Sequence, residues 1–294
     1  MRKTAYLFVG LVALVATGCR KGTVEPRPEQ KAIVEFSSKV DVSVNYTRAD
    51  QNTFNGVIGA INPVDGWEFS PEDVRFDGLT GNASVAQPIT TSPARVVVPV
   101  GDYKFVSCAV SGNGTLTPVG DNIDLVGGLQ TADNDVVWAS ATAHVVNHNN
   151  EPFGVQLAYE HVFSAVRFEL TCDAVADVNA LMSEATIAGI ENLKLPTSGT
   201  LNIRTGAITP STTLLGDGAS VVWKSNYLVT PGVSKAGELT VTYRGSEYKG
   251  TLPAKNFEAG QRLVISIKLN TSSLGFTATI KDWTEIIDDN LTLE

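Results

Sequence analysis

Residues 155–168 read VQLAYEHVFSAVRF, and the order of apolar and polar side chains in this stretch decides the class of fold. Val155, Leu157 and Tyr159 alternate with polar or small residues, which is the period-two pattern of a strand with one buried face. The pattern recurs along the chain between clusters of Gly, Pro, Asn and Asp that are typical of turns. We expect strand segments at residues 33–36, 40–44, 95–100, 103–110, 136–146, 155–170, 185–195, 221–230, 239–243, 263–269 and 276–283.

One stretch favours a helix instead. Asp173 is a residue type that caps helix N-termini, and the apolar residues at 174, 175, 178, 181 and 182 would fall on one face of a helix that begins there. We therefore expect a short helix within residues 173–185. The remainder of the chain predicts an all-β protein with short connections, which favours sandwiches over a parallel sheet.

The chain has 294 residues, of which 43% are hydrophobic and 18% are charged, and this is the composition of a protein that packs a core. Its two halves have a similar density of strand patterns, and each has enough strands for a sandwich. We place the boundary near Glu160 and His161, which gives an N-terminal sandwich at residues 32–160 and a C-terminal sandwich at residues 161–294.

The charge balance and the missing motifs exclude several function classes. Lys and Arg number 22 against 31 Asp and Glu, so the net charge is -9, which is the wrong sign for binding nucleic acid through its phosphates. The sequence contains no Gly-x-Ser-x-Gly, His-Glu-x-x-His or Gly-x-x-x-x-Gly-Lys motif. We predict that the protein is not an enzyme and needs no cofactor.

The first residues have the features of an export signal. Arg2 and Lys3 are positive, residues 5–16 form an apolar run, and small residues at 16–18 stand directly before Cys19. The run is shorter than the roughly 20 apolar residues that a membrane-spanning helix needs. The pattern resembles a bacterial lipoprotein signal, which implies cleavage after residue 18 and lipidation of Cys19. The alternative is an ordinary secretory signal with an incidental cysteine.

Residues 19–31 predict a flexible tether between the lipid and the fold. From residue 20 to residue 31 the sequence is RKGTVEPRPEQK, which has two prolines, six charged residues and little to bury. The side chains after Cys19 are basic, whereas an acidic run often marks lipoproteins of this kind for surface display. The sequence therefore leaves open which face of the outer membrane the protein occupies.

Several other side chains could carry chemistry, but simpler structural roles are favoured for each. Cys108 and Cys172 fall in different predicted domains, so we expect two free buried thiols rather than a disulfide. His161 at the domain boundary is expected to be structural rather than a metal ligand. The acidic run at residues 288–290 is expected to be solvated, and we predict no metal site. Core packing is favoured over sugar stacking for the four tryptophans, Trp67, Trp138, Trp223 and Trp283.

A series of short motifs follows the lipoprotein signal in the order found in one bacterial family. Taken together, these motifs resemble the fimbrillin-like lipoproteins of the Bacteroidales. The motifs are YTRA at 46–49, PVGDYKF at 99–105, DVVWA at 135–139, the opening stretch at 155–168, AGQRL at 259–263 and IKDW at 280–283.

The resemblance implies a subunit or anchor of a type V pilus that has two tandem transthyretin-like β-sandwiches. It implies transport to the outer membrane as a lipoprotein, cleavage by an arginine-specific protease after the first strand, and association with other pilus subunits by strand donation. On this sequence the released segment would be residues 32–46, and the cut would fall between Arg48 and Ala49. If Arg48 is an ordinary surface arginine, the protein stays anchored through Cys19.

The candidate donor strand lies within residues 274–294. The alternative for residues 276–283 is a strand that completes the chain's own C-terminal sandwich. A second class of function also stays open, that of an outer-membrane-anchored glycan-binding lipoprotein. A pilus subunit needs a first strand that can leave, whereas a glycan binder needs an exposed aromatic platform and a closed N-terminal sandwich.

The lipoprotein signal leads to a direct prediction. Metabolic labelling with a fatty-acid analogue is expected to tag the wild-type protein and to leave Cys19→Ala unlabelled, because the thiol is the acceptor of the lipid. Equal labelling of the two proteins would exclude Cys19 as the site.

Overall fold

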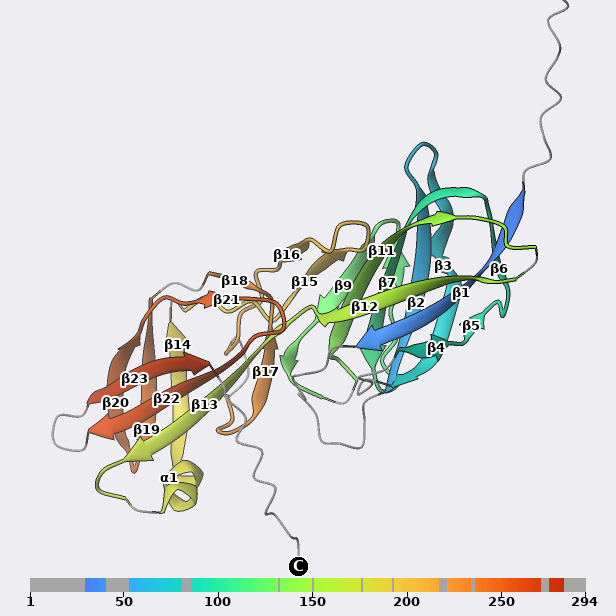
Figure 1. The fold of residues 1–294 in the computed structure, drawn as a ribbon. Helices are drawn as coiled ribbons and strands as arrows, with labels where there is room; N and C mark the ends of the chain where they lie inside the picture. Colours follow the sequence, from blue (N-terminus) through green and yellow to red (C-terminus); the bar gives the residue numbers. More distant parts are fainter. Residues whose placement is uncertain are drawn as a thin grey trace, which may run out of the picture.

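The computed structural model describes residues 30–40, 53–80, 86–131, 133–149, 151–175, 177–191, 193–216, 221–233, 236–270 and 275–282. Within these residues the regular structure is almost entirely β, arranged in two lobes with a small sheet between them (Figure 1). The all-β, two-sandwich architecture expected from the sequence is confirmed. Cys19, Arg48, Ala49, Trp283 and residues 288–290 lie outside the described residues.

The N-terminal lobe is one nine-stranded sheet in the order β4-β1-β12-β11-β7-β2-β3-β5, with β6 also paired to β1. Only Thr90 separates β4 from β5, so the two ends of the sheet are brought together and the sheet curls around its own core. The strands are β1 (Lys31–Val40), β2 (Thr53–Asn62), β3 (Gly66–Thr80), β4 (Gln87–Ile89), β5 (Thr91–Ser92), β6 (Val96–Pro99), β7 (Gly101–Ser111), β11 (Val136–Val145) and β12 (Phe153–His161).

The C-terminal lobe is an eight-stranded sheet in the order β10-β17-β13-β22-β23-β20-β19-β14. Its central strands β13 and β22 run parallel and are paired from Ala165 and Arg262 to Cys172 and Leu269. The strands are β10 (Gly128–Leu129), β13 (Ser164–Cys172), β14 (Ala185–Glu191), β17 (Asn226–Val229), β19 (Gly237–Tyr243), β20 (Ser246–Leu252), β22 (Arg262–Asn270) and β23 (Gly275–Asp282), and the separate pair is β18 (Gly232–Val233) and β21 (Asn256–Phe257).

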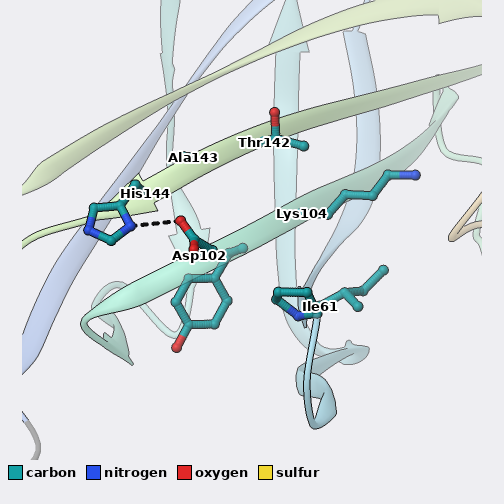
Figure 2. Close-up of a pocket in the computed structure, with 8 residues that line it drawn as sticks. Ile61, Asp102, Lys104, Thr142, Ala143 and His144 are labelled. Carbon is teal, nitrogen blue, oxygen red and sulfur yellow. Dashed lines mark hydrogen bonds and ion pairs between the residues drawn. The ribbon is translucent and has the colours of Figure 1, made fainter.

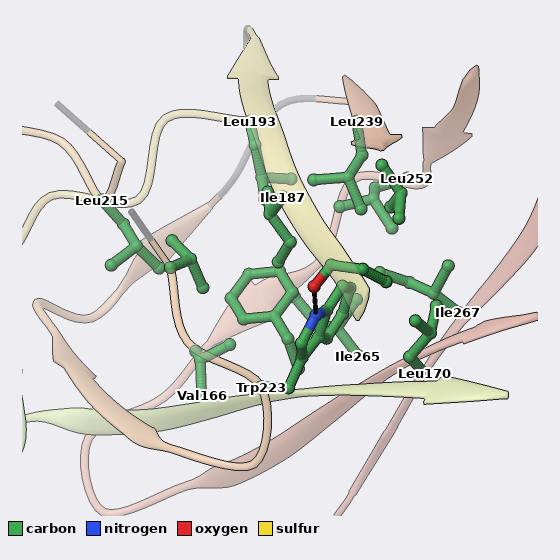
Figure 3. Packing of buried hydrophobic residues seen from close by; sticks show 14 of the residues in the cluster. Val166, Leu170, Ile187, Leu193, Leu215, Trp223, Leu239, Leu252, Ile265 and Ile267 are labelled. Atoms are coloured by element: carbon green, nitrogen blue, oxygen red, sulfur yellow. Dashed lines mark hydrogen bonds between the residues drawn. The ribbon is translucent and has the colours of Figure 1, made fainter. Parts of the chain in front are cut away.

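Aliphatic side chains from opposite sides of the C-terminal sheet fill its core (Figure 3). Val166 and Leu170 of β13, Leu239 of β19 and Ile265 of β22 are completely buried. Trp223 closes this core, and its indole Nε1 donates a 2.7 Å hydrogen bond to the carbonyl oxygen of Ala185. The polar atom of this large side chain is therefore satisfied inside the core.

Among the described residues there is one α-helix, α1 (Val178–Glu184), which lies beside β13 and β14. A helix in this region was expected, but the predicted cap at Asp173 is wrong. Asp177 is the N-cap and accepts hydrogen bonds from the backbone amides of Asn179 and Ala180. Residues 173 and 174 form a turn, and Val175 bridges back to Cys172, so the strand pairing delays the start of the helix.

A third sheet joins the two halves of the chain. It consists of β8 (Pro118–Val119), β9 (Asn122–Val126), β15 (Ser198–Asn202) and β16 (Ile208–Pro210), and β9 and β15 pair from Val126 with Ser198 to Asn122 with Asn202. Beneath this sheet lies a core to which both halves contribute, including the completely buried Val106, Cys108, Phe163 and Leu201. The chain crosses between the lobes where β12 ends at His161, and we retain this point as the proposed boundary.

Several expected strand limits are wrong for identifiable reasons. The segment expected at 155–170 is divided at Val162 and Phe163, where the chain passes from one lobe to the other. The segment expected at 221–230 is a strand only from Asn226, because Trp223 and Lys224 form a turn. The sequence pattern predicted no strand at residues 53–80, where β2 and β3 form a hairpin, because register shifts near Phe54, Ile58 and Ala60 interrupt the alternation.

The shared core leads to a prediction about stability. Leu201→Ala is expected to lower the free energy of unfolding by about 2–5 kcal/mol, because it removes a completely buried side chain between the two halves. Val119→Ala, on the same sheet but 72% exposed, is the matched control and is expected to stay within about 0.5 kcal/mol of wild type. Urea denaturation followed by tryptophan fluorescence measures both. Equal stability of the two variants would contradict the shared core.

Candidate functional site

The first strand fills a slot in the N-terminal sheet and is paired along both of its edges (Figure 1). On one side β1 runs parallel to β12, with pairs from Val34 and Phe153 to Val40 and Tyr159. On the other side its first half pairs with β6 and its second half with β4, both antiparallel. Backbone groups on three neighbouring strands would therefore lose their partners if β1 left.

One face of β1 is buried from Ala32 to Ser38. Ala32, Val34, Phe36 and Ser38 are each at most 4% exposed, whereas Glu35 between them is exposed. This alternation confirms a strand that places every second side chain in the core. Ile33 is only half-buried, because it lies on the opposite face of the strand.

Phe36 is the largest side chain that β1 places in the core. Its ring meets the ring of Phe105 edge to face, with 5.6 Å between the ring centroids. At the fourth inward position the slot takes a small polar residue, and the hydroxyl of Ser38 donates a 3.4 Å hydrogen bond to the carbonyl oxygen of Gln87. The slot is therefore shaped for a small, an aliphatic, an aromatic and a small side chain at alternating positions.

The start of β1 is held by two further hydrogen bonds. The amide of Val100 donates to the carbonyl oxygen of Gln30 at 2.8 Å, and the Asn147 side chain donates to the carbonyl oxygen of Lys31 at 2.7 Å. Beyond Val40 the next described residue is Thr53, so the predicted processing site at Arg48 stays a prediction, as does lipidation at Cys19.

A buried hydrogen-bond network holds the wall of the slot independently of β1. The hydroxyl of Ser107 on β7 donates to the carbonyl oxygen of Val57 at 2.7 Å, so its oxygen is left to accept from the hydroxyl of Tyr159, also at 2.7 Å. Burial raises the pKa of the Tyr159 phenol, which keeps the side chain neutral. Tyr159 lies on β12, so the strand that pairs with β1 is anchored across the sheet to β7 and β2.

Two of the tryptophans lie at the contact between the lobes. The indole of Trp67 donates a 2.8 Å hydrogen bond to Asp121, whose other oxygen lies 2.9 Å from Nε of Arg204. The Arg204 guanidinium lies over the Trp67 ring at 4.5 Å, and the indole of Trp138 donates to the carbonyl oxygen of Ile203 at 2.9 Å. Trp67 and Trp138 are therefore engaged inside the molecule and do not form an exposed platform for a sugar.

The other singled-out residues occupy structural positions. Nδ1 of His161 lies 3.1 Å from a carboxylate oxygen of Asp135, and both side chains are buried. Cys108 and Cys172 are free and buried, as expected, and burial raises the pKa of the Cys108 thiol well above its usual range. Among the described residues no group of His, Cys, Asp and Glu side chains could hold a metal ion.

A pocket of about 480 Å³ on the N-terminal lobe was not predicted, because the residues that line it come from separate strands. Figure 2 shows its lining, in which Nδ1 of His144 and a carboxylate oxygen of Asp102 lie 2.7 Å apart. Lys104 and Ile61 line the pocket away from this pair, and Lys104 donates to the carbonyl oxygen of Arg204. These polar groups are paired within the protein, so the pocket is a weaker candidate for the functional site than the β1 slot.

Comparison with known proteins places this architecture in a family. A family model described as fimbrillin-like matches residues 110–283, which is more than half of the chain. The chain belongs to the fimbrillin-like family. Membership of a fimbrillin-like family supports a pilus-related role for this protein.

Solved structures show the same fold at low sequence identity. A candidate cell adhesion protein of Bacteroides uniformis has a TM-score of 0.59 and 18% identity, and the match covers 86% of this chain and 98% of that one. One from Bacteroides ovatus has a TM-score of 0.50 and 17% identity, with 88% and 99% covered.

A search of the curated proteins found no match. In the part of the chain that the structure describes, no helix has the length and apolar character needed to cross a membrane.

The slot leads to a prediction about the uncut protein. Phe36→Ala is expected to destabilise the N-terminal lobe by about 3–5 kcal/mol, because it leaves a cavity against Phe105. Hydrogen exchange should then quicken in β1 and in its partner β12 more than in the C-terminal sheet. Glu35→Ala, one position away and exposed, is the control and should leave exchange unchanged. Faster exchange in both variants would show that burial of the aromatic ring does not hold the strand.

Proposed function

We propose that this protein is a structural subunit or anchor of a cell-surface pilus that assembles by strand exchange. A lipid on Cys19 holds the exported chain at the outer membrane, with residues 20–31 as the tether. Cleavage between Arg48 and Ala49 then separates β1 from the rest of the fold. The observation that carries the proposal is the place of β1, which is paired on both edges, buried on one face and followed by the polar segment that contains Arg48.

The energetics of the slot explain why cleavage is needed. While β1 is present, it buries Ala32, Val34 and Phe36, and burial of a Val or Phe side chain is worth roughly 1.5–3 kcal/mol. Its backbone also pairs with β12, β6 and β4. An intact chain therefore keeps the strand, and a cut chain can exchange it for another that satisfies the same groups.

Partners in this proposal are other pilus subunits, each of which inserts a strand from residues 274–294 into the slot. A chain that is not cut keeps β1 and remains an anchor tethered by its lipid. Both roles use the same fold, and cleavage at Arg48 decides between them.

Limited digestion under native conditions tests the proposal. An arginine-specific protease is expected to cut the wild-type protein first at Arg48, and the nicked protein is expected to form multimers whose size grows with concentration. Arg48→Lys should resist the protease and stay monomeric while keeping the charge. Arg95→Lys is the matched control, because Arg95 is an exposed arginine outside the strands, and this variant should be nicked like wild type.

Two results would contradict the proposal that cleavage at Arg48 turns the protein into an assembling pilus subunit. One is a nicked protein that stays monomeric and soluble at every concentration. The other is preferential cutting at Arg95 or another exposed arginine, with Arg48 left intact. In either case a permanently anchored lipoprotein becomes the better account.

A further inference from the structure

A second, smaller pocket lies on the N-terminal lobe, between the β2–β3 hairpin and the loop that follows β7. Its volume is about 200 Å³, and three separate stretches of the chain contribute to it. No described residue that lines it belongs to β1 or to a strand paired with β1, so it is separate from the β1 slot. The described lining residues are Asn55, Gly56 and Val57 of β2, Arg75 and Asp77 of β3, and Asn113, Gly114, Thr115 and Leu116 of the loop.

A bulge in the hairpin forms one wall of this pocket. Between regular pairs on either side, β2 has one residue, Asn55, opposite two residues of β3, Asp77 and Gly78. Gly78 has a φ of 75°, which favours glycine. Bulges re-aim side chains and are frequent beside functional sites. Asp77 lines the pocket together with Arg75, two positions earlier on the same strand.

The loop at residues 112–116 forms another wall and is held in place by its backbone. The amide of Asn113 donates a 2.7 Å hydrogen bond to a carboxylate oxygen of Asp133. A Cβ at Gly114 would clash with the carbonyl oxygen of Asp133, so glycine is what lets the loop pack this closely. The side chains that the loop presents to the pocket are therefore carried by a fixed backbone.

Asn55 ties the two walls together. Its Nδ2 donates a 2.8 Å hydrogen bond to the carbonyl oxygen of Gly112, and its Oδ1 accepts a 3.0 Å hydrogen bond from the amide of Gly78. One side chain therefore joins the start of the loop to the bulge. A pocket that is pre-formed in this way can bind a ligand without the cost of ordering its walls.

Four polar side chains around this pocket keep their hydrogen-bonding groups available. In the part of the chain that the structure describes, they are exposed, and none is hydrogen-bonded or ion-paired to another group of the protein. These side chains are those of Arg75, Asp77, Asn113 and Thr115. Arg75 supplies only donors, Asp77 supplies only acceptors, and the amide and the hydroxyl supply both. The pocket thus offers donors and acceptors whose formal charges cancel.

We propose that this pocket binds one neutral hexose residue of a glycan. Each sugar hydroxyl both donates and accepts, so a ring with several hydroxyls can satisfy Arg75 and Asp77 together. An anionic ligand would be repelled by Asp77 and by Asp133 beside the loop, and a cationic ligand would be repelled by Arg75. The volume lies below the roughly 300–1,000 Å³ of pockets for drug-sized molecules, so the pocket takes a single ring.

The rest of the lining favours a sugar over another ligand with balanced charges, such as a free amino acid. The two charges of an amino acid would occupy Arg75 and Asp77 but leave Asn113 and Thr115 without partners, whereas hydroxyls around a ring can reach all four. Because no described lining residue is aromatic, recognition depends on hydrogen bonds and not on ring stacking. The inference is independent of strand exchange, because the pocket is present in the uncut protein.

A titration of the intact, uncut protein followed by saturation-transfer NMR tests the inference. The neutral probes are the methyl glycosides of glucose, galactose and mannose, and the comparison ligands are glucuronate, glucosamine and serine. At least one methyl hexoside is expected to bind, and each comparison ligand is expected to bind at least about tenfold more weakly than that hexoside. An oligosaccharide that ends in the same hexose is expected to bind as well, because the site takes the end of a glycan.

Variants of the two charged side chains locate the binding. Arg75→Ala and Asp77→Ala are each expected to weaken binding of the methyl hexoside at least about tenfold, because each removes a hydrogen bond to a charged group. Both side chains are exposed and unpaired, so the fold is expected to survive. Arg95→Ala and Asp124→Ala remove the same kinds of exposed side chain outside the pocket and should keep the wild-type affinity.

Three results would overturn the inference. The site is excluded if no methyl hexoside binds, or if Arg75→Ala or Asp77→Ala keeps the wild-type affinity. The class of ligand is wrong if glucuronate, glucosamine or serine binds more tightly than every methyl hexoside. If a methyl hexoside binds but the oligosaccharide ending in the same hexose does not, the pocket takes a free sugar and not a glycan.

Discussion

The parallel pairing of β1 with β12 is the interaction on which the N-terminal lobe depends. Without β1 the sheet would lose the link from β12 to β6 and β4, and the core around Phe105 would open to water. The core of the lobe thus depends on the first strand of the described chain. Under the proposed function, this same strand is the one that cleavage releases.

Several contacts that hold the N-terminal lobe together do not involve β1. Tyr159 is tied to Ser107, and through it to Val57, by hydrogen bonds that do not involve β1. Behind β7 lies the core shared with the C-terminal lobe, so both faces of this strand are buried. The β9–β15 pairing and the contact of Arg204 with Trp67 and Asp121 join the lobes. None of these contacts involves β1, so they would remain in the opened state that the proposed function requires.

Sequence reasoning failed where non-local contacts override a local pattern. Asp173 is a good N-cap by type, but the strand β13 extends to Cys172 and bridges to Val175, which moves the cap to Asp177. Ile33 is more apolar than Ala32, but the register with β12 and β6 places Ala32 inward. The β2–β3 hairpin has no regular alternation, because bulges interrupt its pairing. The hairpin is nevertheless held in the sheet, because β2 also pairs with β7. In each case the deciding partner is distant in the sequence.

The sequence by itself determined the class of the fold and the order of its parts. Alternation along 155–168 and in the other strand segments specifies strands because a period of two is a local property of the backbone, and Cys108 and Cys172 were already expected to stay apart. Only the tertiary structure decided how the lobes share a sheet, which residues of β1 face the core, and that Trp67 and Trp138 are occupied by Asp121 and Ile203. These features follow from pairing between strands that are far apart in the chain. The local periodicity of a strand does not determine which other strand it will pair with.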